Sequence, residues 1–258
     1  MPSFEGIPFR NWRDYDYATA RRALVSAMGQ LCRHPLLKKE YGITPRCWVR
    51  RRIKDEDWYV WDSLRLLPTA GSRDFRKVPH LTLAIRRDDV FVRLNFPNEV
   101  KASERQMLAD LGIEGLTQAL RQTLAALRRE LQGVSGWVPV VEVVQRHWDR
   151  GRSALPTYDA RLSADLRTAL PPARQSHGGG GPKYQPAWLQ AAYGAFVPKP
   201  DANIRLGVGI VFPYEKCGWL AQPRSLDRFA HAWVGCRHLV DATNKNAISA
   251  ARSDRGKP

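Results

Sequence analysis

The stretch that decides the fold is HLTLAIR (80–86) followed by VFVRLNF (90–96). Apolar side chains occupy every second position of both segments: Leu81, Leu83, Ile85, Val90, Val92, Leu94 and Phe96. A period of two is typical of a strand that buries one face. Residues 87–89 between the segments are polar and predict a tight turn. The two segments therefore predict an antiparallel hairpin.

Two strands are predicted before this hairpin, RCWVRRRI (46–53) and WYVWDSLRLL (58–67), which would complete a four-stranded meander. Apolar residues at helical spacing predict helices over 14–33 and 103–132. Pro35, just past the first helix, fits its end. The second helix is expected to break into two at its internal glycines, Gly112 and Gly115.

A further strand is predicted at 137–145, where Pro139 favours an edge position. A short helix at 160–170 follows. These elements predict the α+β class, with an antiparallel sheet flanked by helices.

The domain division rests on PPARQSHGGGGPKYQP (171–186), because four consecutive glycines disfavour regular structure. This segment is expected to be a linker or a mobile loop. Residues 1–170 would form the larger α+β domain. Residues 187–244 would form a smaller α+β module with a helix at 186–196, a strand at 204–212 and a C-terminal hairpin. A basic tail would follow at 245–258.

The charge of the chain points to an anionic partner. Among 258 residues there are 41 Lys and Arg against 25 Asp and Glu, a net charge of +16. Such an excess predicts attraction to polyanions, of which nucleic acid is the commonest. Four cysteines do not suggest a disulfide scaffold, and no apolar run is long enough to span a membrane. Without a signal-like N-terminus, a cytoplasmic location is the default expectation.

A basic, aromatic strand is the first candidate site. Alternation would place Arg46, Trp48, Arg50 and Arg52 on one face, with Lys54 just beyond. Arginines between flat rings suit a nucleic-acid backbone with bases stacked beside it. The alternative is a solvated face whose arginines stack on the protein's own tryptophans. Lys183 beside the glycine run could add a phosphate contact, although the P-loop spacing is missing.

The C-terminal segment AHAWVGC (230–236) and HLVDAT (238–243) is the second candidate. If these were strands with a turn at Cys236, His231 and Asp241 would face each other across a hairpin. Their Cβ atoms would be roughly 4.5–5.5 Å apart, close enough for an imidazole–carboxylate hydrogen bond. Such a bond prepares an imidazole to act as a general base.

These residues resemble the His/Asp hairpin of transglutaminase-like proteins, which share a papain-like core. The resemblance implies that His231 would be the base of a nucleophilic cysteine and that Asp241 would orient it. The family's cysteine begins a helix, whereas the matching helix here begins Tyr184-Gln185-Pro186 without one. Cys217 is the remaining candidate nucleophile, and it lacks a helix N-terminus that would lower its thiol pKa. An acyl-transfer enzyme, an inactive relative and a structural hairpin therefore remain open.

Two weaker patterns complete the candidates. Cys32/His34 and Cys236/His238 form two Cys-x-His pairs, which match no standard zinc spacing. Asp88 or Asp89 with Glu99 and Lys101 loosely fits a magnesium nuclease pattern. Neither leads us to predict a metal or a cofactor. The leading prediction is nucleic-acid or polyanion binding, by the protein alone or as a subunit of a nucleoprotein complex. The enzyme is the alternative.

Overall fold

The computed structural model describes residues 17–49, 53–55, 59–66, 79–86, 88–96, 102–147, 157–170, 203–222 and 224–243. Within this part of the chain, seven strands form one sheet in the order β1-β2-β3-β4-β7-β5-β6. All neighbouring strands are antiparallel. The strands are β1 (Ile53–Asp55), β2 (Tyr59–Arg65), β3 (His80–Ile85), β4 (Asp89–Phe96), β5 (Val138–His147), β6 (Thr157–Asp165) and β7 (Asn203–Pro213).

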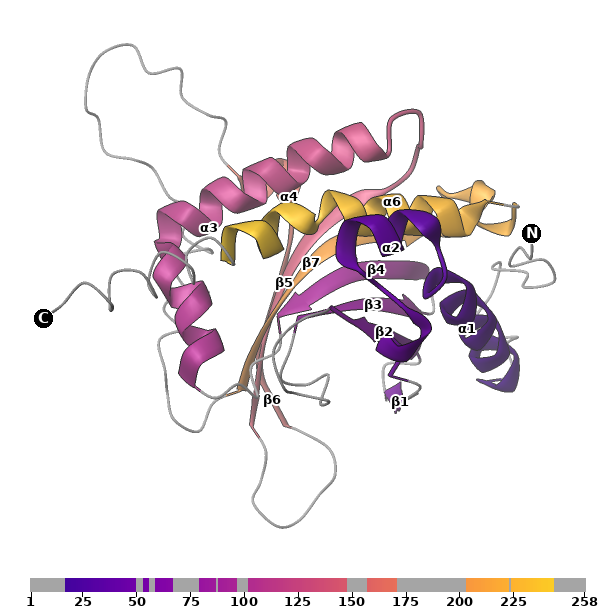
Figure 1. The fold of residues 1–258 in the computed structure, drawn as a ribbon, viewed down its shortest axis with the longest axis horizontal. Helices are drawn as coiled ribbons and strands as arrows, with labels where there is room; N and C mark the ends of the chain where they lie inside the picture. The colour runs from indigo at the N-terminus through magenta and orange to yellow at the C-terminus, as the bar shows by residue number, and fades with distance from the viewer. Residues whose placement is uncertain are drawn as a thin grey trace, which may run out of the picture.

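Helices gather on one side of this sheet (Figure 1). Helix α1 contacts β2 and β3, whereas α6 contacts β4 and β7 and also packs on α2 and α3. This α+β arrangement confirms the predicted fold class. No helix among the described residues is long and apolar enough to cross a bilayer. The helical segments are α1 (Tyr17–Leu31), α2 (Pro35–Tyr41), α3 (Ala102–Glu130), α4 (Leu166–Ala169), α6 (Ser225–Gly235), and the 3-10 turns η2 (Pro45–Cys47) and η4 (Gly218–Ala221).

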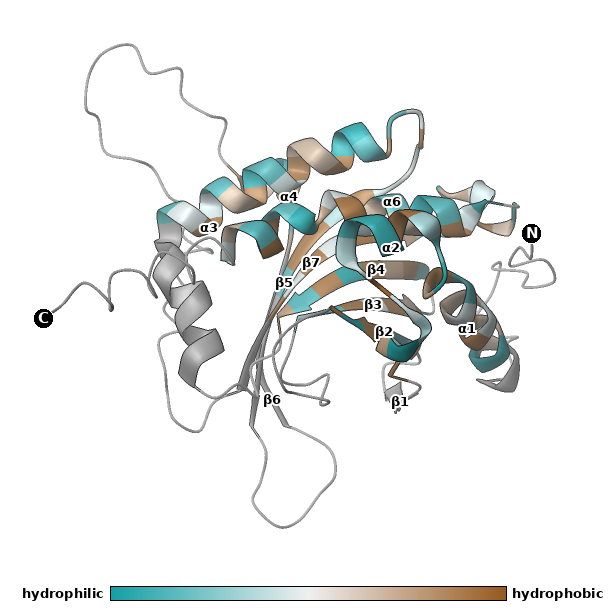
Figure 2. Cartoon of the chain, in the orientation of Figure 1, coloured by the Kyte–Doolittle hydropathy of each residue, from teal (hydrophilic) through white to brown (hydrophobic). Residues whose placement is uncertain are grey.

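The core lies between these helices and one face of the sheet. The apolar positions that predicted the β3–β4 hairpin all face this side, and Leu81, Leu83 and Leu94 are fully buried. Along α3 and α6, teal and brown residues alternate in Figure 2, as expected for helices that bury one side. Hydrophobic burial on this face is therefore the main force that holds the helices to the sheet.

The N-terminal helix has the predicted inward face, and Leu24, Met28 and Leu31 are fully buried. The expectation for Pro35 was incomplete. This proline does follow the first helix, but it also begins α2. A proline at the first helical position loses no hydrogen bond, because the N–H there has no partner within the helix. Gly42 then ends α2 with a left-handed backbone, φ +66°.

Helix α3 is continuous, so the predicted break at Gly112 and Gly115 is wrong. Each internal glycine costs about 1 kcal/mol relative to alanine. Burial of Leu116, Leu120 and Leu127 on the following turns outweighs that cost. The helix does change direction part-way along its length (Figure 1).

The strand predicted at 204–212 is β7, and it lies in the middle of the sheet between β4 and β5. The segment predicted as a separate C-terminal module therefore shares one sheet and one core with the N-terminal elements. The expected two-module division is corrected accordingly. β5 lies between β7 and β6, so the expected edge position of this strand is wrong. Pro139 itself is paired only with β7, because β6 pairs with β5 from Val140 onward. The predicted linker at 171–186 and the helix at 186–196 lie outside the described residues.

The predicted C-terminal hairpin is wrong. Residues 225–235 form α6, and residues 237–243 are also helical. The sequence fits both periods, because Leu226, Phe229 and Trp233 recur at helical spacing as well. Gly235, expected to lie in a strand just before the turn at Cys236, instead allows α6 to approach α3: a Cβ there would lie 2.5 Å from the Leu127 Cδ2. The helix predicted at 160–170 is also corrected, because residues 157–165 form β6 and only α4 is helical.

Candidate functional site

The predicted basic strand at 46–53 is not a continuous strand. Arg46 lies in the 3-10 turn η2, and Trp48 forms only an isolated bridge with Leu64. The Trp48 indole N–H donates to the Asp62 carboxylate at 2.6 Å, and its ring packs beside Gly29 of α1. This tryptophan therefore packs against its own chain and is not an open platform for stacking a base.

The other predicted nucleic-acid contacts are only partly described. Arg46 is exposed, as expected. Lys54 lies in β1, opposite Val60 of β2. Arg50, Arg52 and Lys183 lie outside the described residues.

Exposed cations gather instead on the helices and their ends. We call Arg21, Arg33, Lys38 and Lys39 the α1–α2 cations. All four are exposed, whereas Leu37 and Tyr41 of the short helix α2 point into the core. Arg128 and Arg129 near the end of α3 are also exposed.

Carboxylates near α2 and α6 are engaged in ion pairs within the protein. Glu40 accepts a hydrogen bond from Arg237, and the Asp227 carboxylate lies 3.0 Å from the His34 Nε2. Asp241 lies 3.4 Å from the Arg237 Nε. Because these acids pair with Arg237 and His34, they compensate the exposed lysines of α2 only weakly. Lys39 is 3.8 Å from Glu40, yet its side chain is 80% exposed.

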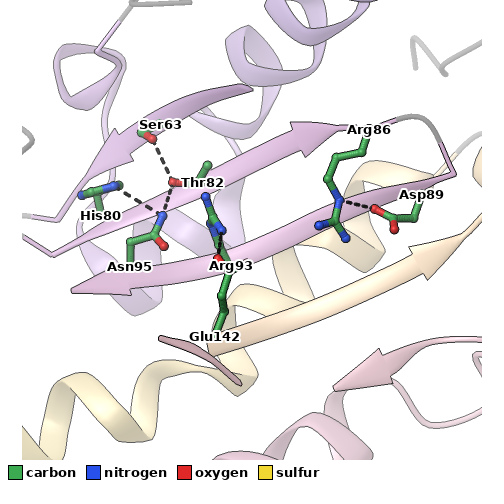
Figure 3. Close-up of polar contacts among 8 residues, drawn as sticks. All are labelled: Ser63, His80, Thr82, Arg86, Asp89, Arg93, Asn95 and Glu142. Atoms are coloured by element: carbon green, nitrogen blue, oxygen red, sulfur yellow. Dashed lines mark hydrogen bonds and ion pairs between the residues drawn. The ribbon is translucent and has the colours of Figure 1, made fainter. Parts of the chain in front are cut away.

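A second polar group lies on the face of the sheet opposite the helices (Figure 3). We call its six residues the polar network. Each alternates along its strand with residues that face the helices. None is more than 4% exposed: Ser63, His80, Thr82, Arg93, Asn95 and Glu142.

Hydrogen bonds connect residues of the network between β2, β3 and β4, and an ion pair connects β4 with β5. The Ser63 and Thr82 hydroxyls are 2.9 Å apart, and the Asn95 Nδ2 donates to the Thr82 Oγ1 at 2.6 Å. The His80 Nε2 lies 3.4 Å from the same amide nitrogen. Arg93 on β4 donates to the Glu142 carboxylate on β5 at 2.7 Å.

The glycines of β7 make the ion pair possible. In the register, Gly209 lies opposite Arg93 and Gly207 lies opposite Glu142, so the pair crosses diagonally over β7. A Cβ at Gly207 would lie 3.1 Å from the Asn95 Oδ1 and 3.5 Å from the Arg93 Cδ. A side chain there would crowd the path that the Arg93 side chain takes.

The Arg93 guanidinium meets the Glu142 carboxylate, the Ser63 hydroxyl contacts Thr82, and the His80 ring contacts Asn95. These contacts link β2, β3 and β4 to one another and link β4 to β5 across β7.

Sequence reasoning missed this network because it treated polar residues between core positions as solvent-facing. The pattern Gly207-Val208-Gly209 in the predicted strand 204–212 was the available signal. Glycine inside a strand often marks the close approach of another chemical group.

The residues of the alternative enzyme prediction do not come together. The His231 Nδ1 lies 2.9 Å from the Glu130 carboxylate of α3, and Asp241 pairs with Arg237. The Cys217 thiol donates to the Ser135 carbonyl over 3.7 Å. Each of the three residues therefore has a partner other than the one that a catalytic triad requires.

Burial also suppresses the reactivity of Cys217. Desolvation raises the pKa of this thiol to about 11, although Arg228 and Lys216 act in the opposite direction. The thiolate is the reactive form, and it is populated only as the pH approaches this raised pKa. Burial therefore disfavours the thiolate form of Cys217 at neutral pH.

We expect Cys217 in the folded protein to react with a maleimide at pH 8 about a hundredfold more slowly than in the denatured chain. The shift of its pKa from 9.0 to about 11 lowers the thiolate fraction by that factor, and burial slows access further. Peptide mass spectrometry would assign the label to Cys217. Rapid labelling of the native protein would revive the nucleophile hypothesis.

The metal patterns find no support in the described residues, which contain no cluster of three or more His, Cys, Asp and Glu suited to a metal ion. Cys32 donates to the Gly29 carbonyl, and burial raises the pKa of Cys236 to about 12. Asp89 of the nuclease pattern pairs with Arg86, seen at the right of Figure 3. Glu99 and Lys101 lie outside the described residues.

Comparison with known proteins adds no relative. No protein-family model matches the chain, and no curated protein matches its sequence.

Proposed function

We propose that the protein binds nucleic acid, or another polyanion of similar charge density, through the α1–α2 cations. The observation that carries this proposal is the excess of exposed cations over exposed carboxylates on the described surface. The exposed acidic residues there are Asp88, Glu114 and Glu215. The side chains of Asp227 and Asp241 are each 42% exposed, but they pair with His34 and Arg237. None of these belongs to α1 or α2, so the cations of these helices face solvent with little compensation.

The arrangement suits phosphates spaced along a chain. Arg33 lies two residues past the end of α1, and Lys38 and Lys39 lie on the solvent side of α2 within six residues of it. The Arg33 guanidinium is anchored by a 2.7 Å hydrogen bond to the Gly29 carbonyl, which limits its freedom. Arg21 adds a cation near the start of α1, away from Arg33. Neutralisation of phosphates by such side chains releases counterions and favours binding without sequence specificity.

Salt dependence tests the proposal. We expect a fluorescent oligonucleotide to bind near 50 mM salt and to lose affinity steeply by 200 mM, as counterion release requires. Absence of binding near 50 mM salt, or affinity that salt leaves unchanged, would contradict the proposal.

The double substitution Lys38→Gln/Lys39→Gln should weaken binding and reduce the slope of log K against log salt by about 2. The control is Arg128→Gln/Arg129→Gln, which removes the same charge from the surface of α3. We expect the control to change affinity far less, because a general loss of net charge acts only at long range. Equal effects of the two variants would place the contact elsewhere.

A further inference from the structure

The first turn of α6 combines several features of an anion site. The helix begins at Ser225 after Arg224, whose backbone is left-handed with φ 76°, and no side chain caps it. The N–H groups of a helix N-terminus carry partial positive charge that favours anions. Side chains on this turn add further donors.

Two side chains on this turn hold buried polar atoms without a hydrogen-bond partner. One is the Ser225 hydroxyl, in a residue only 1% exposed, and the other is the Arg228 Nη1. The two residues are three positions apart and therefore lie on one side of the helix. A buried donor without a partner is costly, so both atoms call for a group that accepts hydrogen bonds.

The Arg228 guanidinium is held in place. It lies 4.3 Å from the centre of the Trp219 ring, and the Trp219 indole N–H donates to the Ser135 carbonyl at 3.3 Å. A guanidinium stacked on an anchored ring loses little freedom when it binds, and its planar fork matches the oxygens of a phosphate.

The surrounding charge is positive. Arg224, which immediately precedes Ser225, is exposed, and Arg228 lies within this first turn. The acid within the first turn is Asp227, and the His34 ring lies 3.0 Å from its carboxylate. The positive charge at the start of α6 is therefore only partly compensated.

We propose that the first turn of α6 binds a phosphate group, with Arg228 and Ser225 as donors and the helix N-terminus behind them. The group could belong to a nucleic-acid backbone or to a small phosphorylated molecule, which offer the same oxygens. In its nucleic-acid form the inference rests on the proposed function, and in its small-molecule form it does not.

Inorganic phosphate is the first probe, added to the ¹⁵N-labelled full-length protein with sodium chloride of equal ionic strength as the reference. We expect saturable shifts of the backbone amides of Ser225–Arg228. Arg228→Gln should weaken this binding at least about tenfold, since it removes charge-assisted hydrogen bonds. Arg129→Gln, which removes an exposed arginine from α3, should leave it unchanged. Shifts that do not saturate, that fall elsewhere, or that survive Arg228→Gln would overturn the inference. The wild-type titration decides the point even if Arg228→Gln fails to fold.

An oligonucleotide is the second probe, and it separates the two proposals. If the oligonucleotide shifts the same backbone amide signals and competes with phosphate, the bound group is a phosphate of the nucleic-acid backbone. If the oligonucleotide binds without shifting these amide signals, whereas phosphate does shift them, the site serves a small phosphorylated molecule. Oligonucleotide binding without any phosphate effect would overturn the inference and leave the proposed function intact. A phosphate effect without oligonucleotide binding would contradict the proposed function and support the phosphate site.

Discussion

Glu142→Ala should lower the free energy of unfolding by about 3–5 kcal/mol, the range for removing one partner of a buried ion pair. The Arg93 and Glu142 side chains are only 5% and 3% exposed. The substitution leaves the Arg93 guanidinium buried without this carboxylate, and water cannot easily replace it. Chemical denaturation followed by tryptophan fluorescence would measure the loss, because Trp233 is fully buried in the core.

The loss should come from the uncompensated charge and not from the lost attraction itself. We therefore expect Arg93→Met/Glu142→Leu, which replaces both partners with apolar side chains of similar size, to recover most of the stability. Recovery would show that the pair determines how this face packs and adds little net stability. A double variant no better than Glu142→Ala would contradict this explanation.

A surface pair provides the control. Arg167 and Asp165 are 2.6 Å apart, but their side chains are 45% and 26% exposed. Arg167→Ala should cost less than about 1 kcal/mol, because solvent screens such pairs. A loss as large as that of Glu142→Ala would mean that burial is not what makes the Arg93–Glu142 pair important.

The elements predicted correctly are those specified by the pattern of residues within the element itself. The β3–β4 hairpin carries a period of two on both sides of a polar turn, and α1 carries one apolar face at helical spacing. The position of β7 could not be predicted in this way. Nothing within residues 204–212 says that the strand lies between β4 and β5, since that depends on pairing with segments far away in sequence.

The candidate site was harder to predict than the fold, for the same reason. Trp48 looked like a stacking platform because its partner, Asp62, is fourteen residues away and its neighbour Gly29 lies on another element. His231 and Asp241 looked like a pair because the alternation of their segment also fits a strand. When a segment satisfies two periods, tertiary packing decides between them, and here the contact of Gly235 with Leu127 favours the helix.

Gly209→Ala should destabilise the protein by about 3 kcal/mol, at the upper end for overpacking a well-packed interior. A Cβ at this position would lie 2.1 Å from the Val92 carbonyl oxygen and 2.5 Å from the Arg93 Cα. Both are backbone atoms of the neighbouring strand, so no side-chain rotation can relieve the contact. Either β4 and β7 must separate, or the register must break at the centre of the sheet.

The matched control is Gly218→Ala, because a Cβ there would meet nothing within 4 Å. We expect this variant to stay within about 0.5 kcal/mol of the wild type. Both variants remove the same backbone freedom from the unfolded chain, so their difference isolates the contact in the folded state. If Gly209→Ala were as stable as Gly218→Ala, β4 and β7 could not approach as closely as they do here.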